Sequence, residues 1–224
     1  APVSAPDAVP FWSPAEIEAA IPGTIAHLAE HRVLAYPTET VYGFGGAIDE
    51  PSVDALVALK GRDPGKPFLV LVASSEMVAR LDLRLAGDAA RLAARHWPGA
   101  LTLVLPGGDR RVPARLRGPE GGVAVRWTSH PAIARLLLAY GSPITSTSAN
   151  RAGRPPAMSA AEIVADWSDA IRRSQLRVLD GGRLVPSPSS TVVDCTGRRL
   201  RVIRPGAIPS ATLRESVPDL IGDL

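Results

Sequence analysis

The sequence contains a single cysteine, Cys195, and only two lysines, Lys60 and Lys66. One cysteine excludes an internal disulfide and any metal site that needs several cysteines. No apolar run approaches the roughly 18 residues that a membrane-spanning helix requires. Residues 1–10 contain neither Lys nor Arg and no apolar stretch, unlike a secretory signal peptide. These absences predict a cytoplasmic protein with no membrane partner.

The rest of the composition is typical of a globular protein. Hydrophobic residues make up 46% of the 224 residues and charged residues 21%, and the length suits one large domain or two small ones with a sizeable core. The formal net charge of +3 is too small to establish nucleic-acid binding. Since only two of the 25 basic residues are lysines, the closeness of Lys60 and Lys66 is either chance or the mark of a site.

Short apolar segments alternate with helical patterns along most of the chain. The alternation predicts an α/β fold with helices around a buried, partly parallel β-sheet. The last three apolar segments have no clear helices between them, which predicts that part of the sheet is antiparallel. The predicted strands cover residues 33–36, 68–72, 101–105, 123–126, 144–146, 177–179, 191–194 and 200–203.

The first helical pattern begins at Ser13, which can cap it, with Pro14 at the first helical position. We expect Pro22 and Gly23 to interrupt this helix and a new helix to begin at Thr24. We expect residues 1–12 to be a flexible lead-in, residues 13–208 to form one domain, and residues 209–224 to be a C-terminal tail.

Two segments offer chemical groups in the first half of the chain. Residues 36–45 follow a predicted strand with hydroxyls, a carboxylate and glycines, where open α/β sheets place ligands; the alternative is a turn capped by threonines. Residues 60–67 carry Lys60, Arg62 and Lys66 between glycines. This segment does not fit a P-loop, because its glycines are too closely spaced, Pro67 replaces the Ser or Thr, and a helix precedes it where a P-loop has a strand. The three side chains could instead contact a triphosphate. The alternative interpretation is a basic loop exposed to solvent.

The second half of the chain offers three more candidates. Residues 143–150 contain four consecutive hydroxyl residues and Asn150. These side chains could donate hydrogen bonds to phosphate or ribose oxygens, or they could cap a helix. Residues 188–194 and 204–207 bring a Ser/Thr cluster and Arg204 to the ends of late strands. Arg126 ends an apolar strand and must pair with a carboxylate of the protein or of a ligand. His130 is expected to begin a helix.

The polar segments together resemble the YrdC/Sua5 family of threonylcarbamoyl-AMP synthases. Seven motifs occur in the family's order across residues 14–208, and together they are far more specific than any one of them. The motifs are residues 36–43, 60–62 with 66–67, 97–102, 123–126, 146–150, 190–194 and 204–207. The resemblance implies a YrdC-like fold, a twisted mixed sheet flanked by helices with a basic concave ligand-binding face. It also implies the short form of the family, which lacks the C-terminal Sua5 domain.

The resemblance implies that L-threonine, bicarbonate and ATP with Mg²⁺ react in this hollow to give threonylcarbamoyl-AMP and pyrophosphate. The product serves the threonylcarbamoyladenosine modification of tRNA, through downstream threonylcarbamoyl-transferase proteins. The implied threonine contacts are Thr38, Arg126, Ser146 and Ser190. The implied ATP contacts are Lys60, Arg62, Lys66, Ser148 and Arg204. No catalytic nucleophile, general base or metal ligand is assigned, because such a reaction needs positioning and charge neutralisation above all.

The sequence departs from the family pattern at two places. Asp63 stands where many members carry proline, and Leu71 stands where some carry histidine near threonine. Two other functions remain open at this point. A basic hollow could bind double-stranded RNA or tRNA without chemistry, although the small net charge predicts only weak tRNA binding. A carbamoyl-transfer domain is the third possibility, but such domains occur fused to acylphosphatase and zinc-finger segments.

Overall fold

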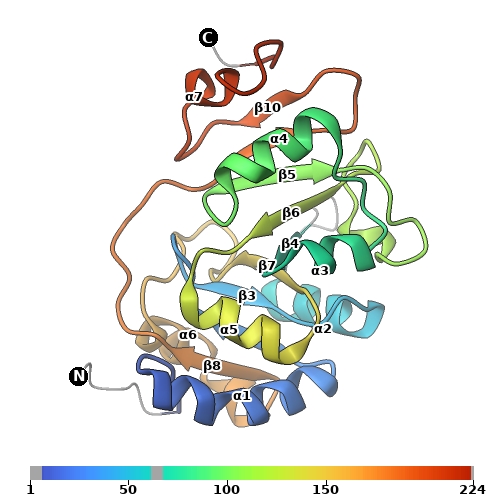
Figure 1. Cartoon of the computed structure of the whole chain (residues 1–224). Helices are drawn as coiled ribbons and strands as arrows, with labels where there is room; N and C mark the ends of the chain where they lie inside the picture. The colour runs from blue at the N-terminus through green and yellow to red at the C-terminus, as the bar shows by residue number, and fades with distance from the viewer. Residues whose placement is uncertain (1–6, 62–67, 223–224) are drawn as a thin grey trace.

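The computed structural model describes residues 7–61 and 68–222. Its ten strands form one sheet in the order β1-β8-β2-β3-β7-β4-β6-β5-β9-β10 (Figure 1). The strands are β1 (Val9–Pro10), β2 (Val33–Tyr36), β3 (Gly43–Gly45), β4 (Leu69–Val72), β5 (Leu101–Leu105), β6 (Val123–Trp127), β7 (Ile144–Ser148), β8 (Leu176–Asp180), β9 (Thr191–Asp194) and β10 (Arg201–Arg204).

The sheet mixes parallel and antiparallel pairs. β8 runs parallel to both β1 and β2, β4 runs parallel to β6, and β5 runs parallel to β9. The hairpin of β2 and β3 is antiparallel, as are the pairs of β7 with β3 and β4, β5 with β6, and β9 with β10. The predicted mixed α/β fold is therefore confirmed.

Helices cover both faces of the sheet, with α4 and α5 in front of it in Figure 1 and α2 and α6 behind it. The helices are α1 (Pro14–Ala29), α2 (Glu50–Lys60), α3 (Ser75–Arg80), α4 (Gly87–His96), α5 (Pro131–Tyr140), α6 (Ala160–Arg172) and α7 (Ser210–Arg214), with a 3-10 turn at Ala114–Leu116. Strands covered on both faces need apolar side chains on both sides, which is why the central strands read as apolar runs. Within the described residues, no helix has the length and apolar character needed to cross a membrane.

Helix α1 is continuous, so the predicted interruption at Pro22 is wrong. Pro22 lies inside the helix and is exposed, as is Glu18, whose carbonyl loses its helical partner. Water can satisfy that carbonyl, while Ile21 and Leu28 are buried on the opposite side. Packing of this apolar face outweighs the cost of an internal proline, about 3 kcal/mol.

Both ends of the described chain are more ordered than the sequence suggests. Val9–Pro10 pairs with β8, and Phe11 is only 1% exposed, so the predicted flexible lead-in is wrong from Val9 onward. The predicted C-terminal tail contains α7 and buries Leu213, Val217 and Leu220. Buried apolar side chains therefore anchor both ends of the described chain to the core.

Candidate functional site

Buried polar side chains gather on one part of the sheet, around a cavity of about 350 Å³. Its wall comes from segments far apart in the sequence: the loop after β2, strands β3, β4, β6 and β7, the segment before β9 and the end of β10. The lining residues are Thr38, Glu39, Thr40, Val41, Gly43, Leu69, Leu71, Arg126, Ser146, Thr147, Ser148, Pro156, Ser187, Ser189, Ser190 and Arg204.

Strand register creates the floor of this cavity. Ser148 is paired with Gly43, and Ser146 two residues earlier is paired with Leu69 on the other neighbouring strand. Residues two apart on a strand point to the same face of the sheet, so both serine side chains face the cavity. We predicted a polar loop after Ser146, whereas strand β7 continues to Ser148. The site therefore lies on the sheet face as well as at strand ends.

Gly43 keeps the floor open on strand β3. A Cβ atom at this position would come within 3.4 Å of Ser146 Oγ. Because Gly43 has no side chain, space remains above the serine hydroxyls. A glycine inside a strand often marks a place where a ligand approaches the backbone closely. Neither β3 nor the effect of its glycine was predicted, because residues 36–45 were interpreted as a loop.

Thr38 shapes the loop after β2 with its hydroxyl. Thr38 Oγ1 donates to Val41 O at 2.6 Å and accepts from the backbone N–H groups of Thr40 at 3.2 Å and Val41 at 3.3 Å. The sequence left a ligand-binding loop and a threonine-capped turn as alternatives. The capped turn is present, and it also lines the cavity.

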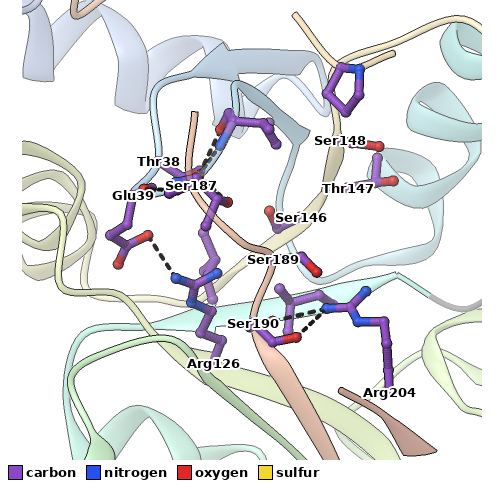
Figure 2. A pocket seen from close by; sticks show the side chains of 16 residues that line it. Thr38, Glu39, Arg126, Ser146, Thr147, Ser148, Ser187, Ser189, Ser190 and Arg204 are labelled. Carbon is purple, nitrogen blue, oxygen red and sulfur yellow. Dashed lines mark hydrogen bonds and ion pairs between the residues drawn. The ribbon is translucent and has the colours of Figure 1, made fainter. Parts of the chain in front are cut away.

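Arg126 lies on the left of the cavity in Figure 2, where its guanidinium faces the Glu39 carboxylate. The two residues form an ion pair, with Arg126 Nη2 3.3 Å from Glu39 Oε2. Burial lowers the pKa of Arg126, and the charge of Glu39 partly opposes this. Burial by itself would raise the pKa of Glu39, but Arg126 and hydrogen bonds outweigh it, so the pKa of Glu39 lies below its ordinary value. The sequence predicted that Arg126 pairs with a carboxylate of the protein or of a ligand. The structure is compatible with both, because Glu39 lies beside Arg126 and both line a cavity of ligand size.

Arg204 supplies a second guanidinium to the same cavity. Its Nη2 donates to Ser190 O at 2.8 Å and to Ser190 Oγ at 3.0 Å, and Ser190 Oγ lies 2.9 Å from Thr102 Oγ1. Burial lowers the pKa of Arg204, and the positive charge of Arg126 lowers it further. No carboxylate pairs with Arg204 in the described part of the chain. Two cations close enough for Arg126 to lower the pKa of Arg204, of which only Arg126 has a carboxylate partner among the described residues, favour an anionic ligand.

Lys60 reaches the end of strand β7 from the last turn of α2. Its Nζ donates to Thr147 Oγ1 at 3.1 Å and to Asn150 Oδ1 at 3.0 Å, and also to Ser148 O. Lys60 Nζ also lies 3.3 Å from Ser148 Oγ, so Lys60 adjoins the cavity lining and holds the polar segment of β7 in place. The sequence placed Lys60 in a phosphate-binding cluster but did not predict this contact across the fold.

The structure brings six of the nine predicted ligand contacts to the cavity wall: Thr38, Arg126, Ser146, Ser148, Ser190 and Arg204. Lys60 adjoins them, while Arg62 and Lys66 lie outside the described residues. Glu39, Ser187 and Ser189 were not predicted as site residues. Glu39 stands inside the motif of residues 36–43, which was the available signal. His130 stands at the N-cap position of α5, so it begins the helix as expected.

The family model Sua5_yciO_yrdC, described as "Telomere recombination", matches residues 26–206. A threonylcarbamoyl-AMP synthase of Chromohalobacter salexigens is 39% identical over 186 residues, which cover 81% of this chain and 96% of the relative. A threonylcarbamoyl-AMP synthase of Pyrococcus abyssi is 35% identical over 198 residues, 88% of this chain, but the match spans only 56% of that longer relative.

A solved structure adds a comparison of the fold. The structure of P. abyssi Sua5 complexed with L-threonine matches with a TM-score of 0.83 and 31% identity, covering 95% of this chain and 62% of that one.

Proposed function

The chain belongs to the Sua5/YciO/YrdC family, and we propose that it is an L-threonylcarbamoyladenylate synthase that uses L-threonine, bicarbonate and ATP and releases pyrophosphate. The observation that carries this proposal is the pair of guanidiniums in one hydroxyl-lined cavity, the buried Arg126 and the more exposed Arg204. The curated relatives that carry this activity in their names support an enzyme over a non-catalytic RNA-binding module.

The cavity suits small polar ligands. About 350 Å³ lies within the roughly 300–1,000 Å³ typical of small-molecule sites. Serine and threonine hydroxyls can either donate or accept, which fits the mixed groups of an amino acid, a carbamate and a phosphate. A nucleic-acid duplex would instead require an extended positive surface.

The reaction requires two bond-forming steps. Threonine's amine attacks the carbon of bicarbonate to give a carbamate and water, and a carbamate oxygen then attacks the α-phosphate of ATP as pyrophosphate leaves. We assign threonine to the side of Thr38, Arg126, Ser146 and Ser190. We assign the nucleotide to the side of Ser148, Arg204 and Lys60. Arg62 and Lys66, which lie outside the described residues, stay predicted ATP contacts. The side chains align the reactants and balance their negative charge, which is the main requirement of phosphoryl transfer.

Magnesium would accompany the nucleotide. No group of three or more His, Cys, Asp or Glu side chains that could hold a metal occurs within residues 7–61 and 68–222. Mg²⁺ in ATP sites is held largely by phosphate oxygens and water, so a dedicated protein cage is not required. When bound, the ion would neutralise charge on the triphosphate, while Arg204 contributes the neighbouring positive charge of the protein.

The product would enter tRNA modification. We propose that downstream threonylcarbamoyl-transferase proteins pass the threonylcarbamoyl group to a tRNA adenosine. Direct tRNA binding by this chain would be weak and salt-sensitive, because the net charge is only +3.

Mass spectrometry of the reaction product tests the proposal. The purified chain is incubated with L-threonine, ATP, Mg²⁺ and ¹³C-labelled bicarbonate. We expect threonylcarbamoyl-AMP that carries one ¹³C atom, together with pyrophosphate. Reactions without threonine or without the protein are the controls. Pyrophosphate release without a labelled product, or no release at all, would refute the proposed reaction.

A further inference from the structure

The two carboxylate oxygens of Glu39 have very different surroundings. Oε1 accepts hydrogen bonds from Thr128 Oγ1 at 2.8 Å, Ser129 Oγ at 3.0 Å and the backbone N–H of His130 at 3.1 Å, as well as from the Ser129 N–H. Oε2 is buried and accepts no hydrogen bond from any described residue. One oxygen therefore anchors the start of α5, and the other is left for a donor that the described chain does not provide.

Arg126 likewise has a buried hydrogen-bond donor without an acceptor among the described residues. Its Nε donates to Gly99 O at 3.1 Å, but Nη2 is buried and has no hydrogen-bond acceptor among the described residues. Nη2 and Glu39 Oε2 attract each other across 3.3 Å without the geometry of a hydrogen bond. Buried polar atoms are nearly always hydrogen-bonded in native proteins, so two unsatisfied atoms beside one cavity indicate a missing ligand.

We propose that Glu39 and Arg126 act together as a receptor for the charged end of a free α-amino acid. Arg126 Nη2 donates to the carboxylate of the ligand, and Glu39 Oε2 accepts from its α-ammonium group. An α-amino acid carries these opposite charges on one carbon, so they lie side by side, as Nη2 and Oε2 do. The assignment rests on the proposed function and adds Glu39 as a specificity-determining residue.

A purely structural role for Glu39 is the competing explanation. Glu39 could serve only to hold Arg126 and the segment of residues 128–130. The Glu39→Gln variant separates the two roles, because glutamine keeps one oxygen for the partners of Oε1 but loses the negative charge. Ser129→Ala is the matched control, since it removes one donor to Oε1 and leaves Oε2 unchanged.

Calorimetric titration with two ligands tests the assignment by binding alone. L-threonine is compared with 3-hydroxybutanoate, which has the same carboxylate and hydroxyl but no amino group. We expect the unaltered chain to bind threonine at least about tenfold more tightly, as one charge-assisted hydrogen bond provides. Glu39→Gln should lose about tenfold in threonine affinity and none in 3-hydroxybutanoate affinity. Ser129→Ala should keep the preference for threonine.

The possible failures are distinguishable. Equal binding of both ligands by the unaltered chain would overturn the role of Glu39 without any variant, even if Glu39→Gln does not fold. A parallel loss of both ligands in Glu39→Gln would show that Glu39 only holds Arg126. If the unaltered chain bound no threonine at all, the proposed substrate would be wrong and this assignment with it.

Discussion

Leu71 and Arg126 are register partners on the parallel strands β4 and β6, and both line the cavity. Leu71 is 2% exposed and Arg126 is 5% exposed. An apolar neighbour gives the guanidinium no hydrogen bonds, which leaves Arg126 dependent on Gly99, Glu39 and any ligand. Leu71 stands where the resemblance gives some family members a histidine, so under the proposed function Arg126 would recognise the threonine carboxylate without that neighbour.

Arg126→Lys should raise the KM for threonine much more than the KM for ATP. Lysine keeps the positive charge but cannot donate two parallel hydrogen bonds to a carboxylate. We expect a rise of about tenfold or more in the threonine KM, and a larger rise for Arg126→Ala. Steady-state kinetics with each substrate varied in turn provides both values.

Melting temperatures of the same Arg126 variants provide the control for a structural effect. Removal of Arg126 leaves the buried Glu39 carboxylate without its ion-pair partner, so Arg126→Ala should also melt at a lower temperature. A destabilised variant with an unchanged threonine KM would show that Arg126 serves the sheet and not the ligand.

Lys60→Ala should weaken the use of ATP sharply while the protein remains folded. Lys60 Nζ holds Thr147 and Asn150, so its loss frees the polar end of β7 as well as removing a cation. A charged hydrogen bond contributes about 1.5–3 kcal/mol, which corresponds to about a tenfold or greater rise in the ATP KM. Arg80→Ala is the control, because Arg80 is a cation that bonds to Gly141 O away from the cavity. Equal ATP KM values in the two variants would contradict the prediction.

Gly45→Ala should destabilise the fold far more than Gly46→Ala. A Cβ atom at Gly45 would lie 1.8 Å from Thr145 O of the central sheet, whereas one at Gly46 would meet its nearest neighbour at 3.5 Å. Overpacking against backbone costs about 1–3 kcal/mol or more. Urea unfolding of the two variants measures the difference, and similar midpoints would mean that β3 does not approach β7 this closely.

The Glu39–Arg126 pair should make stability depend on acid pH. The pKa of Glu39 lies below its ordinary value of 4.5. A lowered carboxyl pKa stabilises the folded state fully above the unfolded pKa, and this contribution is lost as pH falls through the folded pKa. We expect the free energy of unfolding of the unaltered chain to approach that of Glu39→Gln as pH falls below about 4.5. Denaturant titrations across this range test it, and a constant difference would show that Glu39 does not titrate with folding.

The sequence by itself determined the fold class and most of the strands. Apolar segments such as residues 101–105 and 191–194 are local patterns, and each contains the information that a buried strand needs. The motifs also identified the residues that form most of the cavity wall, because polar groups at the ends of apolar strands stand out against the surrounding pattern. Pro22 is the counterexample, since its local preference was overridden by the packing of α1.

Only the tertiary structure decided how these residues meet. Glu39 and Thr128 are 89 residues apart, and Lys60 and Asn150 are 90 apart, yet each pair is hydrogen-bonded. Such contacts depend on the order and register of the strands. A shift of the register by one residue would turn every side chain of a strand to the opposite face of the sheet. The local pattern shows which side chains are polar or apolar. The relative positions of the strands place Glu39 against Arg126 and turn Ser146 and Ser148 toward the same cavity.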